Sequence, residues 1–144
     1  MPELTLEKAQ AIVVAALRRA REANFKPTAV AVLDARGALK AFGAEDGTSL
    51  KRPEIAHGKA HGALSLGQGS RALAKAATER PHFIAAVTHA VGGSLIPVPG
   101  GVLIRASADG PVIGAVGVTG DTSDNDEAAA LAGIEATGLS GDAG

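Results

Sequence analysis

Two of the four histidines in this chain have a spacing that suits metal or haem chemistry. His57 and His61 are four residues apart in a segment expected to be helical, so their side chains project from one face. Two imidazoles at this spacing can chelate a metal ion, and a neutral imidazole can ligate haem iron. The alternative is a pair of partly exposed histidines on a Gly- and Ala-rich helix. No third ligand follows at a typical spacing, which argues against a dedicated zinc site.

Glu54 shares this helix face approximately, because it precedes His57 by three residues and His61 by seven. The three side chains either form a small polar cluster or are an ordinary solvent-facing stripe. If the cluster is catalytic, Glu54 is a candidate acid or base.

A second candidate site is the Gly- and Pro-rich segment that contains Pro99, Gly100 and Gly101. Proline favours an extended path here, and glycine lets the backbone approach a ligand or another subunit closely. Exposed N–H groups of Gly100 and Gly101 can cradle an anionic group. The alternative is a tight contact between layers or subunits.

Hydrophobic periodicity and turn signals predict the elements that position these residues. Helices are expected over 5–23, 53–66, 70–79 and 127–137, with one or two further turns over 81–90; strands are expected over 28–33, 38–44, 102–107 and 112–119. Short turns join neighbouring strands, so the sheet should be mainly antiparallel with helices on its faces, an α+β layered domain. We expect one domain over residues 1–137 and a flexible tail over 138–144.

Composition excludes several classes of function. Apolar residues make up 46% of the 144 residues but aromatic residues only 2%, so the core must consist of Ala, Val, Ile and Leu. The net charge is −1 and neither Tyr nor Trp is present, which argues against nucleic-acid binding. Cysteine is absent, which excludes disulfides and thiolate chemistry. No signal peptide or membrane-spanning run is visible, so we expect a cytoplasmic protein without membrane contact.

Four stretches resemble the GlcG/HbpS-like family, which also includes the C-terminal domain of PduO-type proteins. They are the strand and Asp-x-x-Gly turn at 32–37, the helical Ile-Ala-His-Gly-Lys-Ala at 55–60, the Gly/Pro-rich 92–104, and Gly-x-x-Gly-x-x-Gly at 114–120 with Asp126-Glu127 and Ala132-Gly133 after it. Their order and spacing match over nearly the whole chain, and the combination is more specific than any single motif.

The resemblance implies a central five-stranded antiparallel sheet between helical layers, similar to profilin- or PAS-like sandwiches, and a homo-oligomer. Some relatives bind haem, and others are encoded beside small-molecule catabolic or corrinoid pathways. His57 and His61 stand where small or apolar residues are common in the family.

Lys59 matches the lysine of the family's Lys-Ala pair. In a partly desolvated pocket, a lysine can bind a carboxylate, act as a base or form an imine. Alternatively, Lys59 makes a structural contact with a carboxylate such as Asp126 or Asp34. Asp126 would otherwise serve the dipole of the last helix, where negative charge is favoured.

Two functions are consistent with these residues, and we favour the first. The first is binding of a small molecule, with haem or a related tetrapyrrole as the leading ligand held by His57, His61, Lys59 and the segment from Pro99 to Gly101. The second is an enzyme of a catabolic pathway, an isomerase, deaminase or hydro-lyase, that acts on a small organic acid through Lys59 with Glu54 or Asp126 as acid/base partner. An accessory oligomeric protein without chemistry is a third alternative.

Overall fold

The computed structural model describes residues 2–144. In this part of the chain, five helices and five strands follow one another as α1 (Leu6–Glu22), β1 (Ala29–Asp34), β2 (Leu39–Ala44), α2 (Arg52–Leu66), α3 (Ser70–Glu79), α4 (Pro81–Ala90), β3 (Gly101–Arg105), β4 (Val112–Thr119), α5 (Ser123–Glu135) and β5 (Ser140–Asp142). The predicted α+β class and the antiparallel five-stranded sheet are therefore confirmed.

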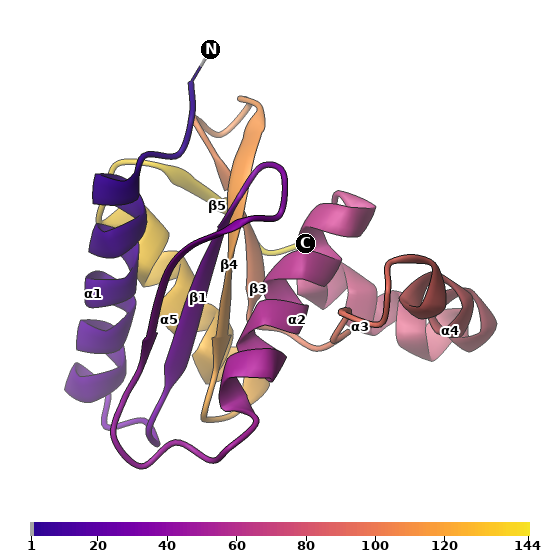
Figure 1. Ribbon diagram of the computed structural model, residues 1–144, viewed down its shortest axis with the longest axis horizontal. Helices are drawn as coiled ribbons and strands as arrows, with labels where there is room; N and C mark the ends of the chain where they lie inside the picture. Colours follow the sequence, from indigo (N-terminus) through magenta and orange to yellow (C-terminus); the bar gives the residue numbers. More distant parts are fainter. Residues whose placement is uncertain (1) are drawn as a thin grey trace.

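The sheet has the strand order β2-β1-β4-β3-β5, and all neighbouring pairs are antiparallel. Side chains alternate between its two faces, so Val30 and Val32 pack toward one helical layer while Ala31 and Leu33 face the other. Figure 1 shows α1 and α5 on the first face and α2 on the second. The larger aliphatic core lies under α1 and α5.

The ends of α1 and α5 show how local capping sets the helix bounds. Thr5 is the N-cap of α1, and its side-chain oxygen accepts from the backbone N–H of Lys8 at 3.2 Å. By contrast, α5 begins at Ser123 rather than at the expected position 127, because Thr122 caps it by accepting from the N–H of Asn125. Asp126 consequently lies inside the first turn of α5.

Helix α2 is fixed between the sheet and the segment that follows α4. A Cβ atom on Gly117 of β4 would overlap the carbonyl oxygen of Ala56, so this glycine lets α2 lie directly on the sheet. On another stripe of α2, a Cβ on Gly58 would come within 2.5 Å of Cγ1 of Ile96. The N–H of Ile96 also donates to the carbonyl of Gly58 at 3.1 Å. The glycines of α2 are thus contact sites.

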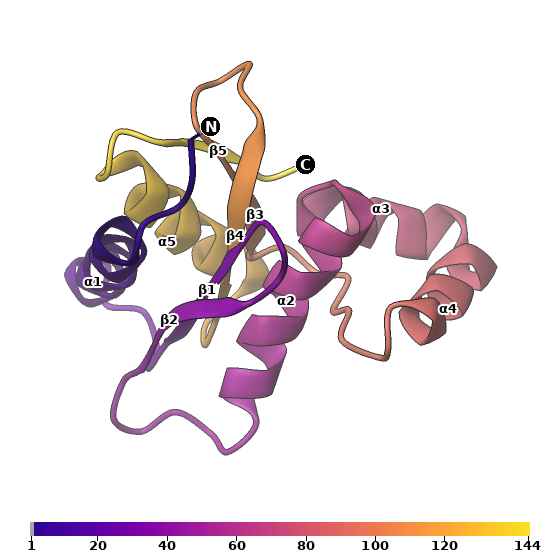
Figure 2. The ribbon, with the colours of Figure 1, turned by 45° about the horizontal axis from the view of Figure 1, so that its top comes forward.

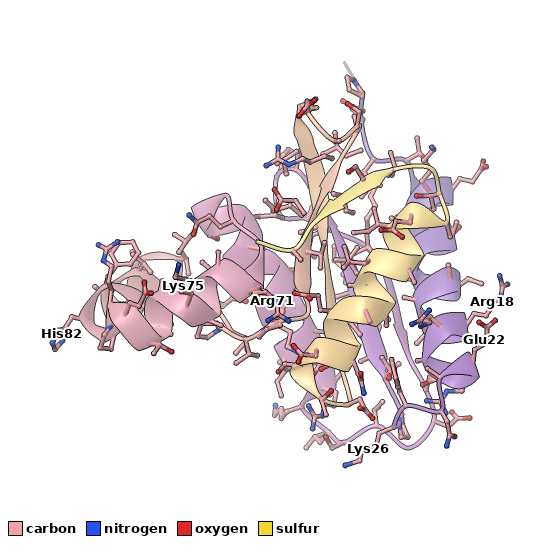
Figure 3. All side chains as sticks on the ribbon, turned by 180° about the vertical axis from the view of Figure 1, so that it is seen from behind. Arg18, Glu22, Lys26, Arg71, Lys75 and His82 are labelled. Atoms are coloured by element: carbon pink, nitrogen blue, oxygen red, sulfur yellow. The ribbon has the colours of Figure 1, made fainter. Side chains whose placement is uncertain are left out.

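Helices α3 and α4 form a hairpin that projects from the layered body (Figure 2). Its own small core contains Leu73, Ile84 and Leu95. Arg71 joins the hairpin to α5 by ion pairs with Asp124 and Glu127, on the face seen in Figure 3. None of the helices in residues 2–144 combines the length and the apolar character that crossing a bilayer requires.

The last residues differ from the flexible tail expected over 138–144. Ser140–Asp142 form β5, which pairs with the edge of β3, and Arg105 makes an ion pair with Asp142 at 3.0 Å. The carbonyl of Ala143 then accepts from the N–H of Arg71 at 3.2 Å. Ser-Gly-Asp has little intrinsic strand propensity, so the unpaired edge of β3 provides this order.

Candidate functional site

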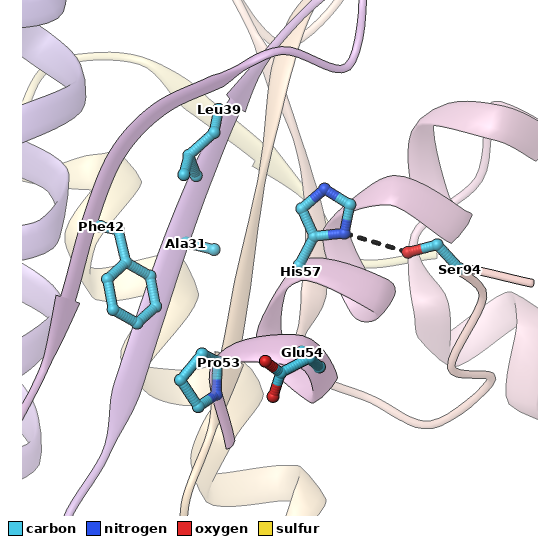
Figure 4. Close-up of a pocket in the computed structure, with 7 residues that line it drawn as sticks. All are labelled: Ala31, Leu39, Phe42, Pro53, Glu54, His57 and Ser94. Atoms are coloured by element: carbon cyan, nitrogen blue, oxygen red, sulfur yellow. Dashed lines mark hydrogen bonds between the residues drawn. The ribbon is translucent and has the colours of Figure 1, made fainter. Parts of the chain in front are cut away.

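A cleft of about 380 Å³ opens between the β1–β2 hairpin and α2. Figure 4 shows its lining side chains, which come from both strands, from the first two turns of α2 and from the segment after α4. They are Ala31, Leu39, Phe42, Pro53, Glu54, His57 and Ser94.

The cleft exists because α2 leaves the edge strand β2 uncovered. The register places Phe42 opposite Ala31 and Leu39 opposite Leu33, so the side chains of Phe42 and Leu39 project on the α2 side of the sheet. Leu39 remains 58% exposed and Phe42 41% exposed. Ala31 has a short side chain that leaves room between them and the helix. One wall of the cleft is therefore apolar and open to a ligand.

His57 is the polar group best placed to meet that ligand. Its Nδ1 lies 3.0 Å from the hydroxyl oxygen of Ser94, and in the described chain its Nε2 has no hydrogen-bond partner. Burial, and secondarily the nearby charge of His61, lowers the pKa of His57. A lowered pKa favours the neutral imidazole, the form that ligates a metal.

His61 lies beside His57, as their spacing predicts. The two rings stack with centroids 5.5 Å apart and an interplanar angle of 16°. Nδ1 of His61 lies 2.8 Å from the carbonyl oxygen of Ser94, which can only accept, so we assign the proton to Nδ1. Ser94 thus holds both imidazoles, although only His57 lines the cleft. Within residues 2–144, no group of three or more His, Cys, Asp or Glu side chains could hold a metal ion.

Lys59 and Asp126 form a buried ion pair away from the cleft. Their side chains are 2% and 3% exposed, and Nζ of Lys59 donates to Oδ2 of Asp126 at 3.1 Å and to the carbonyl of Val118 at 2.9 Å. The other oxygen of Asp126 accepts from the N–H of Asp121. Burial lowers the pKa of Lys59 and raises that of Asp126, and each charge opposes the shift of the other. This geometry favours the structural alternative for both residues.

The segment from Pro99 to Gly101 lies against this ion pair and does not line the cleft. The N–H of Gly101 donates to the hydroxyl of Ser70 at 2.7 Å. Gly100 has φ +123°, and a Cβ there would come within 2.8 Å of Nζ of Lys59. Both glycines thus lie in tight contact with α2 and its Lys59, a geometry that favours the layer contact over an anion cradle.

Sequence reasoning missed five of the seven lining residues, Leu39, Phe42, Ser94, Ala31 and Pro53. The first two leave a signal, because apolar residues on a strand that ends up at a sheet edge mark uncovered surface. Ser94 leaves none, since its contact with His57 joins residues 37 positions apart.

The chain matches the family described as "Haem degrading protein HbpS-like" over residues 4–135. No curated protein matches it. Solved structures do: HbpS is 28% identical with a TM-score of 0.80, covering 94% of this chain and 91% of that one. Klebsiella pneumoniae protein ORFY is 26% identical with a TM-score of 0.83, covering 96% and 93%. PduOC, solved in complex with haem, shares the fold with a TM-score of 0.84 at 22% identity, covering 96% and 97%.

Proposed function

We infer that this chain, which belongs to the HbpS-like family, binds a small molecule in the cleft between β2 and α2, and we propose that the ligand is haem. The observation that carries the proposal is His57, which places an unpartnered Nε2 beside apolar walls. The haem complex of PduOC supports a tetrapyrrole ligand in this fold.

The residues of the cleft fit a haem group. The cleft has a volume of about 380 Å³, within the range of about 300–1,000 Å³ for small-molecule sites. Its open side leaves space for part of a macrocycle. Leu39, Phe42 and Pro53 supply apolar contacts for the ring faces. His57 would hold the iron, and Ser94 would keep its imidazole oriented through Nδ1. When bound, haem supplies an iron centre whose chemistry depends on such axial and second-layer groups.

The enzymatic alternative has no comparable support. Lys59 is buried against Asp126, and neither side chain lines the cleft in the described structure. Glu54 does line it, but without Lys59 beside it.

Haem titration followed through the Soret and visible bands tests the proposal. We expect saturable binding by the wild type and, for His57→Ala, an altered spectrum with affinity reduced at least about tenfold, because a metal ligand is lost. His61→Ala should keep the iron spectrum, since His61 does not line the cleft. His89→Ala, an exposed histidine on α4, is the matched control. Unsaturable binding, or a wild-type spectrum in His57→Ala, contradicts the proposal.

A further inference from the structure

Glu54 is the one carboxylate among the residues of the described chain that line the cleft. It occupies the first turn of α2, next to Pro53 and one turn before His57, and Figure 4 shows its carboxylate at the Pro53 end. The side chain is exposed and makes no ion pair within residues 2–144. Its charge therefore acts on whatever enters the cleft.

The neighbouring cations do not neutralise this charge at the cleft. Arg52 directs its guanidinium to the hydroxyls of Thr119, at 2.9 Å, and Ser49, at 3.2 Å. Lys51 is exposed, and neither cation lines the cleft. At the other end of the cleft, Leu39 follows the turn that carries Arg36, and the guanidinium of Arg36 pairs with Asp34 at 3.4 Å. The cleft is consequently acidic at its Glu54 end, whereas none of the described residues that line its Leu39 end carries a carboxylate.

A haem molecule carries two ionised propionates on one edge of the ring. Like charges repel over several ångströms, and at an exposed carboxylate such as Glu54 this repulsion is strongest at low ionic strength. An orientation with the propionates beside Glu54 is therefore disfavoured relative to the reverse orientation.

We propose that Glu54 determines ligand specificity in this cleft: it discriminates against ligand carboxylates and turns the propionate edge of the ring toward Leu39. The inference rests on the proposed haem site. It assigns Glu54 an electrostatic role in selection and orientation, and it does not require Glu54 to act as an acid or base.

The test compares two probes, iron protoporphyrin IX and its dimethyl ester, which lacks the carboxylate charges. At low ionic strength, Glu54→Gln should bind the free acid about three- to tenfold more tightly than the wild type and bind the ester equally well. The gain should shrink as salt is added. Glu22→Gln removes the same charge from α1, on the opposite face of the sheet (Figure 3), and should change neither affinity.

Orientation is tested by placing a charge at the other end. Compared with Leu39→Gln, Leu39→Glu should weaken binding of the free acid by a larger factor than the gain in affinity seen for Glu54→Gln. The two Leu39 variants should bind the ester with similar affinity. The Gln variant accounts for the lost apolar contact.

The outcomes separate the two proposals. If the wild type binds neither probe, both the haem site and the role of Glu54 are rejected. Suppose that the wild type binds both probes. If Glu54→Gln then leaves the ratio of the affinities for free acid and ester unchanged, or binds the free acid more weakly, the haem site stands and the role of Glu54 is wrong. An equal effect of Leu39→Glu on acid and ester rejects the orientation.

Discussion

At the scale of single residues, the most buried charges among the described residues form one ion pair. Lys59 belongs to α2 and Asp126 to α5, helices that cover opposite faces of the sheet, so their ion pair passes around the end of β4. The carbonyl of Val118 and the N–H of Asp121 add further hydrogen bonds to this pair. In a buried pair, the partner and the hydrogen bonds offset the desolvation of each charge, whereas a lone buried charge has no such compensation.

Removal of one partner should therefore destabilise the protein strongly. We expect Lys59→Met to lower the free energy of unfolding by about 3–5 kcal/mol, because it leaves the Asp126 carboxylate buried and unpaired. The double variant Lys59→Met with Asp126→Asn should regain part of this loss, since no net charge is then buried. Urea unfolding followed by circular dichroism measures both. A Lys59→Met protein as stable as the wild type would show that the pair is dispensable.

At the scale of elements, the cleft depends on how close α2 lies to the sheet. Gly117 allows the backbone of α2 at Ala56 to contact β4. On another stripe of the helix, Ile96 packs against Gly58 and Leu95 packs against Gly62. The same segment carries Ser94 to His57. Small residues thus determine the position of the helix that supplies the polar side of the cleft.

Gly117→Ala should displace α2, because the added methyl group meets a backbone oxygen that no rotamer change can move. We expect a loss of about 3 kcal/mol or more in the free energy of unfolding, at the upper end for overpacking. Gly43→Ala is the matched control, since its Cβ would meet only side chains, Cγ1 of Val13 at 3.0 Å and Cδ1 of Leu17 at 3.4 Å. Its loss should be about 1 kcal/mol. Equal losses in thermal or urea unfolding would contradict this account of α2.

At the scale of the whole molecule, several large apolar side chains lie on the surface. Leu50 is 85% exposed, Leu39 58% and Val14 55%. Leu39 lies at the cleft, and Val14 lies on α1.

We predict that the chain forms a homo-oligomer, as expected from its apolar helix faces and from the family resemblance. Size-exclusion chromatography with light scattering at micromolar concentration should give a mass of at least twice 14.2 kDa. A mass near 14 kDa under these conditions would reject the prediction. Addition of haem to the same sample would show whether the ligand changes the assembly.

Much of the architecture follows from local sequence, because capping, turn chemistry and periodicity act over a few residues. They predicted the first helix, the β1–β2 hairpin and the helical spacing that places His57 beside His61. The turn at Asp34 is a further case: its carboxylate accepts from the N–H groups of Arg36 and Ala38. Such features require no knowledge of distant parts of the chain.

Only the tertiary structure decided which of these residues share a site. The partner of Lys59 is Asp126 rather than Asp34, β5 pairs with β3, and Ser94 orients His57, and each contact joins residues more than 30 positions apart. Local preferences carry no information about such pairs, because the free energy of each contact depends on how helices pack on the sheet. Sequence alone thus determined the α+β order and the histidine face. Packing paired Lys59 with Asp126 and left His57 and Glu54 in the cleft.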